Sequence, residues 1–120
     1  MRRRWTQTDE LSLGELERPY GAWRTGWWID DRELPEDVCA ALNDAGARVG
    51  DELIVDVRTT GYRDSGCYDY PEESSEEREI IAAAVDGTTL PESVFWSLQE
   101  FARTDLRRIQ VDECAAVEER

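Results

Sequence analysis

The chain has 120 residues, which fits one compact domain and excludes a large multidomain enzyme. Its 28 acidic residues outnumber 14 basic ones, all of them arginine, and the net charge of -14 disfavours nucleic-acid binding, because phosphate contacts need clustered basic side chains. A basic protein partner is favoured instead, and 40% hydrophobic residues with five tryptophans suffice for a folded core.

The first thirty residues divide into two predicted segments. Residues 1–19 mix charged and isolated apolar positions with Gly14 and Pro19, so they predict a flexible or loosely docked N-terminal arm. Residues 20–30 predict a strand, in which alternate side chains share a side. The expected buried side holds Trp23, Thr25, Trp27 and Ile29. Trp28 is expected to point the opposite way.

A helix and a strand follow. Residues 34–46 predict a short helix, because apolar residues recur at helical spacing between Pro35 and Gly46. Residues 52–60 alternate cleanly between apolar and polar side chains, which is the pattern of a half-buried antiparallel strand. Its expected buried face holds Leu53, Val55, Val57 and Thr59.

Residues 61–79 predict an exposed acidic loop that contains two glycines and one proline. The stretch 78–85 favours a strand that ends in a tight turn at Asp86 and Gly87. A helix capped by Ser75 is the alternative that the pattern leaves open.

The C-terminal third predicts one more helix and one more strand. The helix follows Pro91 and buries one arc of side chains, namely Val94, Phe95, Leu98, Phe101 and Ala102. Residues 106–112 predict a last strand, and 114–120 a polar tail. The expected fold is therefore a single α+β domain over 20–113, an antiparallel sheet of about four strands with two helices packed on it.

The residues of enzymatic sites are missing from the sequence. Histidine, the usual general base, does not occur, and neither do lysine or the glycine-rich phosphate-binding motifs. Ser65 and Cys67 lie in a glycine-flanked loop, but such glycines serve any tight turn. The three cysteines form no CxxC pair. We therefore expect no enzyme, no cofactor, no metal site and no disulfide framework.

Two features remain as candidates for partner binding. The first is the densest run of acidic residues, Asp69, Glu72, Glu73, Glu76, Glu77 and Glu79. The second is a set of aromatic side chains expected outside the core, Trp96, Trp28, Tyr62, Tyr68 and Tyr70, because aromatic residues dominate binding hot spots. The alternatives are that the acidic run is a solvated surface and that Trp96 covers part of the fold.

The text GYRDSGCYDYPEESSEERE, followed by AVDGTTLP and a helix, resembles small acidic phage or mobile-element proteins of the anti-CRISPR type, over roughly residues 50 to 103. The resemblance implies an inhibitor that occupies a basic nucleic-acid-binding surface of a host protein, such as a subunit of a CRISPR effector. Such a DNA mimic would act in the cytoplasm of the host cell.

Two other functions fit the same composition. One is a self-associating structural or accessory protein of a phage or plasmid, which would form a homo-oligomer. The other is a salt-adapted housekeeping domain whose acidity serves solubility. No apolar run in the sequence is long enough to span a bilayer, so a soluble cytoplasmic protein is expected.

Overall fold

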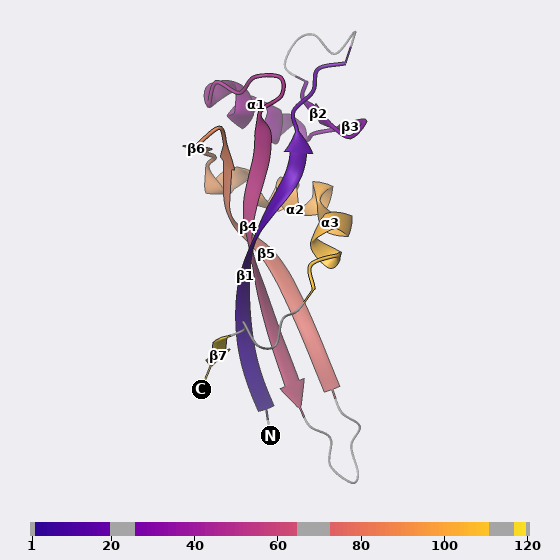
Figure 1. Cartoon of the computed structure of the whole chain (residues 1–120), viewed down its shortest axis with the longest axis vertical. Helices are drawn as coiled ribbons and strands as arrows, with labels where there is room; N and C mark the ends of the chain where they lie inside the picture. The colour runs from indigo at the N-terminus through magenta and orange to yellow at the C-terminus, as the bar shows by residue number, and fades with distance from the viewer. Residues whose placement is uncertain (1, 20–25, 65–72, 111–116, 120) are drawn as a thin grey trace.

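The computed structural model describes residues 2–19, 26–64, 73–110 and 117–119 (Figure 1). The elements are, in chain order, β1 (Arg2–Glu15), β2 (Trp28–Ile29), β3 (Arg32–Glu33), α1 (Glu36–Asp44), β4 (Glu52–Asp64), β5 (Glu73–Val85), β6 (Thr88–Thr89), the 3-10 helix η1 (Glu92–Val94), α2 (Phe95–Phe101), α3 (Arg103–Arg107) and β7 (Val117–Glu119). No helix in these described ranges is long and apolar enough to cross a membrane.

The main sheet is antiparallel and has the strand order β6-β5-β4-β1-β7, while β2 and β3 form a separate small hairpin. The strands β1, β4 and β5 run side by side along the long axis of the molecule and twist strongly around one another (Figure 1). The helices lie against one face at one end of this sheet. The predicted α+β class, with helices packed on an antiparallel sheet, is confirmed.

The core lies between that end of the sheet and the helices. The alternation predicted for 52–60 is confirmed, because Leu53, Val55, Val57 and Thr59 are all buried, whereas Ile54 and Asp56 between them are only half-buried. Helix α2 contributes Leu98, which is fully buried. Burial of this apolar face, at roughly 25 cal/mol per Å² removed from water, is the main force that holds the helices on the sheet.

Residues 78–85 adopt the predicted strand as part of β5, and a tight turn joins it to β6. Asp86 and Gly87 have φ angles of 46° and 77°, the left-handed pair that a type I′ hairpin turn requires. The register shifts between Asp56 and Val57 of β4, opposite Ala82 and Ile80. This bulge keeps Ile80 and Ala83 on the buried face, although they are three positions apart.

The prediction of an N-terminal arm over residues 1–19 is wrong. Residues 2–15 form β1, which pairs along its whole length with β4. Its alternation is hard to recognise in the sequence because polar side chains occupy both faces in the middle of the strand, with Gln7 and Asp9 on one side and Thr8 and Glu10 on the other. The sheet domain therefore begins with β1 and not at residue 20.

The strand predicted over 20–30 can be compared with the structure only at residues 26–30. Only Trp28 and Ile29 are in a strand, and 20–25, including Trp23 and Thr25, lie outside the described residues. Trp27 and Ile29 are buried as predicted. The indole N–H of Trp27 donates to the side-chain oxygen of Asn43 at 3.0 Å, which ties this segment to α1.

Three further boundaries differ from the sequence-based prediction. The acidic loop is shorter than 61–79, because β4 continues to Asp64 and β5 begins at Glu73. Residues 103–107 form α3, so the strand predicted over 106–112 does not start at 106, and residues 111–112 lie outside the described part. The tail predicted for 114–120 contains β7, which pairs with β1. Strand pairing, which the local sequence does not report, sets the first and third of these boundaries, whereas residues 103–107 form a helix in place of the predicted strand.

Candidate partner-binding surfaces

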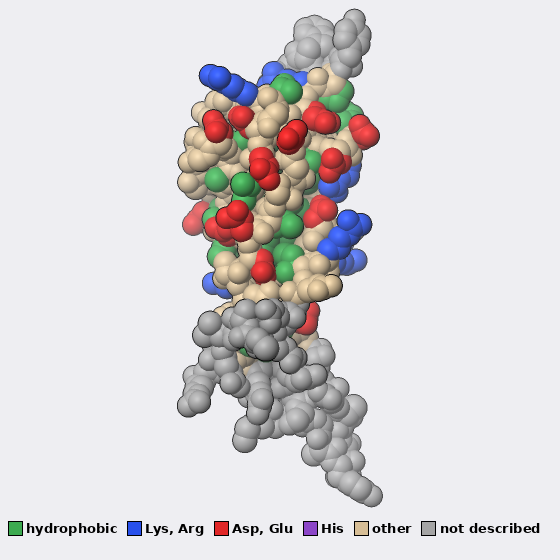
Figure 2. Space-filling model, in the orientation of Figure 1, with side chains coloured by type: hydrophobic (Ala, Val, Ile, Leu, Met, Phe, Trp, Pro, Cys, Tyr) green, Lys and Arg blue, Asp and Glu red, His purple; other side chains and the backbone are tan. Residues whose placement is uncertain are grey.

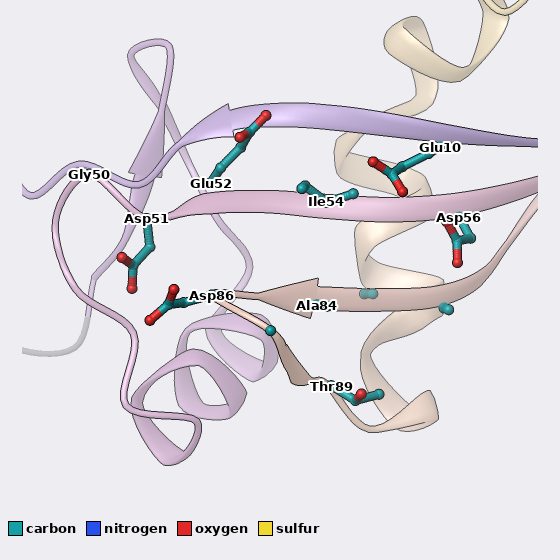
Figure 3. A pocket seen from close by; sticks show the side chains of 12 residues that line it. Glu10, Gly50, Asp51, Glu52, Ile54, Asp56, Ala84, Asp86 and Thr89 are labelled. Atoms are coloured by element: carbon teal, nitrogen blue, oxygen red, sulfur yellow. The ribbon is translucent and has the colours of Figure 1, made fainter.

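The face of the sheet that points away from the helices carries a hollow of about 590 Å³ (Figure 3). Its rim is acidic, and we call it the acidic face: Glu10, Asp51, Glu52, Asp56 and Asp86. These carboxylates come from β1, from β4 with the residue before it, and from the turn after β5. Figure 2 shows this side of the molecule, where red acidic groups surround green apolar ones.

The floor of the hollow is apolar. Ile54 of β4 lies opposite Ala84 of β5, and Asp56 lies opposite Ala82. Because strand side chains alternate between the two faces, the residues between the buried positions of β4 and β5 must point outward here. The small alanines leave room above the floor, so the acidic rim surrounds a shallow apolar depression.

Among the residues that the structure describes, no arginine lines this hollow. Asp51 is oriented locally, since its side chain accepts a hydrogen bond of 2.8 Å from the backbone N–H of Arg48. Glu10, Glu52 and Asp86 are exposed. Carboxylates at the edge of an apolar depression match the usual interface anatomy of an apolar centre inside a polar rim.

Trp96 forms a different surface on the side of the helices. Its side chain is 71% exposed, which makes it the most exposed of the large hydrophobic residues that the structure describes. It lines a hollow of about 410 Å³ between β5 and the helices α2 and α3. The other lining residues are Glu76, Arg78, Gln99, Glu100, Arg103, Leu106 and Arg107. Three arginines against two glutamates make this surface slightly basic, in contrast to the acidic face.

The acidic run 69–79 is only partly described. Asp69, Glu72, Tyr68 and Tyr70 lie outside the described residues, and so do the side chains of Glu73 and Tyr62, whose backbones belong to β5 and β4. Glu76, Glu77 and Glu79 lie on strand β5 and not in a loop.

The described glutamates of this run are divided between the two sides of the sheet. Glu79 is ion-paired with Arg58 on the outward face, and Arg78 donates to Glu76 at 3.0 Å on the other side. Glu77 makes no ion pair with any described residue. The structure therefore does not bring these three glutamates together into one acidic patch.

Trp28 does not join the Trp96 surface. It is half-buried in the small hairpin, where it pairs with Glu33 and bridges to Glu17. Its indole N–H is buried and has no hydrogen-bond partner among the described residues. Of the predicted aromatic anchors, Trp96 is the one that the described structure exposes.

Sequence reasoning missed the acidic face. Part of the signal was available, because the alternation of residues 52–60 already puts Ile54 and Asp56 on the side opposite Leu53. The neighbouring strand was missing from the prediction, because Glu10 belongs to a segment that was not recognised as a strand. Only strand pairing places it opposite Asp56.

Among the residues that the structure describes, no group of three or more metal-ligating side chains is close enough to hold an ion. No protein family, curated protein or solved structure matches this chain. The site must therefore be interpreted from its own geometry and charge.

Proposed function

We propose that this protein is a non-enzymatic inhibitor whose acidic face occupies a basic nucleic-acid-binding surface of a host protein. The observation that carries the proposal is the apolar depression with a carboxylate rim, which no arginine lines within the described part of the chain. A CRISPR effector subunit is the host protein that the resemblance of residues 50 to 103 suggests.

The charge of the whole chain supports the same proposal. A net charge of -14 attracts a basic surface over long range and accelerates encounter. Duplex DNA carries about one negative charge per 1.7 Å of its axis, so carboxylates fixed on a rigid sheet compete for the same cationic groove. The apolar floor adds contact area that a phosphate backbone does not offer, which favours tight binding of a protein surface.

The test is capture from host lysate at moderate salt, followed by displacement of nucleic acid from the captured protein. The test variant carries Glu10→Gln, Glu52→Gln and Asp56→Asn, which remove three rim charges. The control carries Glu17→Gln, Glu36→Gln and Glu92→Gln, three exposed acids outside the hollow, so that both variants have the same net charge.

We expect the control to capture the same protein as the wild type and to displace its DNA or RNA, while the rim variant does neither. An equal loss of capture in both variants would mean that binding depends on net charge alone. Equal capture by both would exclude the acidic face as the contact surface. A stable homo-oligomer that captures nothing would instead favour the self-associating function.

A further inference from the structure

Strand β5 leaves part of its outer edge unpaired. Its inner edge pairs with β4 along the whole strand, but on the outer side β6 pairs only with Ala84 and Val85. Over the stretch Glu76–Ile80, no strand among the described residues lies on that side. An unpaired edge offers a row of backbone N–H and C=O groups to any extended chain that fits.

One hydrogen bond fixes the direction in which these groups point. The backbone N–H of Ile80 donates to the side-chain oxygen of Gln99 on α2 at 2.9 Å, so it points away from β4. In an antiparallel pair, the N–H and C=O groups of one residue point toward the neighbouring strand, and those of the next residue point away from it. The N–H and C=O groups of Arg78 and Glu76 therefore also point outward, whereas those of Glu77 and Glu79 point to β4.

Two hollows flank this edge, one on each side of the sheet. The hollow at Trp96 includes Glu76 and Arg78. The second, of about 470 Å³, is lined by Arg58, Thr60, Glu77, Arg78, Glu79 and Gln99. Alternate side chains of a strand added to the edge would enter the two hollows in turn.

We propose that the edge of β5 over Glu76–Ile80 binds an extended segment of a partner protein by strand addition. The side chains of the segment that face the helices are apolar and rest on Trp96 and Leu106. Those on the other side are basic, because Glu77 has no ion-pair partner among the described residues. This surface is separate from the acidic face, so it adds a second contact to the proposed function and does not depend on it.

A second copy of this chain fits the edge poorly. Two β5 edges paired antiparallel around Arg78 would place arginine opposite arginine and Glu77 opposite Glu79. Like charges directly opposite each other destabilise strand pairing. In this register the charges of the edge oppose self-association, and the net charge of -14 on each copy opposes the approach of a second copy in any register. A segment of complementary charge is favoured instead.

The probe is a capped peptide, acetyl-Val-Lys-Val-Lys-Val-amide, added to the isotopically labelled full chain. A peptide residue opposite Glu76 or Arg78 has its side chain on the helix side, so the valines occupy those positions and direct their N–H groups to β5. The matched controls are two peptides of identical charge, one with N-methylated valines and one with N-methylated lysines.

We expect the amides of Glu76 and Arg78 to shift and to exchange with solvent about tenfold more slowly when the peptide occupies about nine sites in ten, while those of Glu77 and Glu79 stay unchanged. The peptide with methylated valines should not bind, and the one with methylated lysines should bind as the parent does. Absence of parent binding at millimolar concentration, or equal binding by both methylated peptides, would overturn the proposal.

Two variants locate the contact on the protein. Glu76→Pro removes one outward N–H group and leaves the pairing with β4 intact, because proline is tolerated on the free side of an edge strand. Glu76→Ala removes the same carboxylate and keeps the N–H group. We expect the proline variant alone to lose the peptide. Equal affinity of the two variants, both shown to be folded by circular dichroism, would contradict strand addition.

Discussion

The two ends of the sheet, on the same helix-side face, are built from different residues. At the end under the helices, which we call the covered end, β4 contributes Leu53, Val55 and Val57, all fully buried. The end of the sheet beyond the helices is called the extended end. Two and four residues beyond Val57 the same face holds Thr59 and Gly61. The alternation of the strand continues without interruption, but the helices stop, and the chemistry of the side chains changes where they do.

Hydrogen bonds replace apolar packing at the extended end. Gln7 is buried and donates to the backbone oxygen of Gln110 at 3.1 Å, and Arg78 donates to that of Ile109 at 2.9 Å. Both contacts bind the segment after α3 to the sheet. The comparison teaches that the covered end supplies most of the stability, while the extended end depends on individual polar contacts, each worth about 1 kcal/mol.

The largest expected effect tests the covered end. Leu98→Ala removes a fully buried side chain from α2, and it should lower the free energy of unfolding by about 2–5 kcal/mol in urea titrations. The matched control on the same helix is Trp96→Ala, whose side chain is 71% exposed and should cost less than about 1 kcal/mol. A comparable loss in both variants would show that Trp96 belongs to the core and is no partner anchor.

The sequence predicted the covered end well and the extended end poorly. The period-two pattern of 52–60 and the helical spacing around Leu98 arise because one face of each element is buried. A buried face requires apolar residues at regular intervals, and this periodicity can be recognised in the sequence. Gln7 is buried too, but its contacts are with Thr59 on the paired strand and with the backbone of Gln110, both more than fifty positions away. No local pattern reports such pairing, and β1 was therefore interpreted as an arm.

The candidate site shows the same limit. Sequence reasoning selected Trp96 because it lies opposite the apolar arc of its helix, and the structure exposes it. It grouped Glu76, Glu77 and Glu79 by their proximity along the chain, and the strand then separated them onto two faces. Side chains on a strand alternate, so neighbours in sequence are not neighbours on a surface.

An intermediate effect tests the extended end. A Cβ atom at Gly61 would overlap the indole of Trp5, which lies across this glycine. Gly61→Ala should therefore displace the indole and cost about 1–3 kcal/mol of stability, measured by urea titration. In a Trp5→Ala background the same substitution should be nearly neutral. An equal cost in both backgrounds would mean that the indole does not hold this end of the sheet.

The smallest effect concerns Cys39, which is buried in α1 at the covered end. Burial raises the pKa of its thiol above the ordinary value of 9.0, and the backbone N–H of Trp27, which donates to the sulfur at 3.3 Å, opposes this only partly. The unfolded chain therefore loses the thiol proton at lower pH than the native protein does. Unfolding releases protons above about pH 9, so stability must fall as pH rises there.

The slope that one thiol adds cannot exceed about 1.4 kcal/mol per pH unit. Cys39→Ala should remove this contribution and make the loss of stability above pH 9 shallower than in the wild type. Urea titrations of both proteins at pH 8, 9 and 10 measure the change of stability with pH. The difference at pH 8 gives the constant cost of the lost packing, and it is subtracted from the differences at pH 9 and 10. Parallel curves would mean that the thiol ionises as easily in the native protein as in the unfolded chain, and that the covered end admits water at α1.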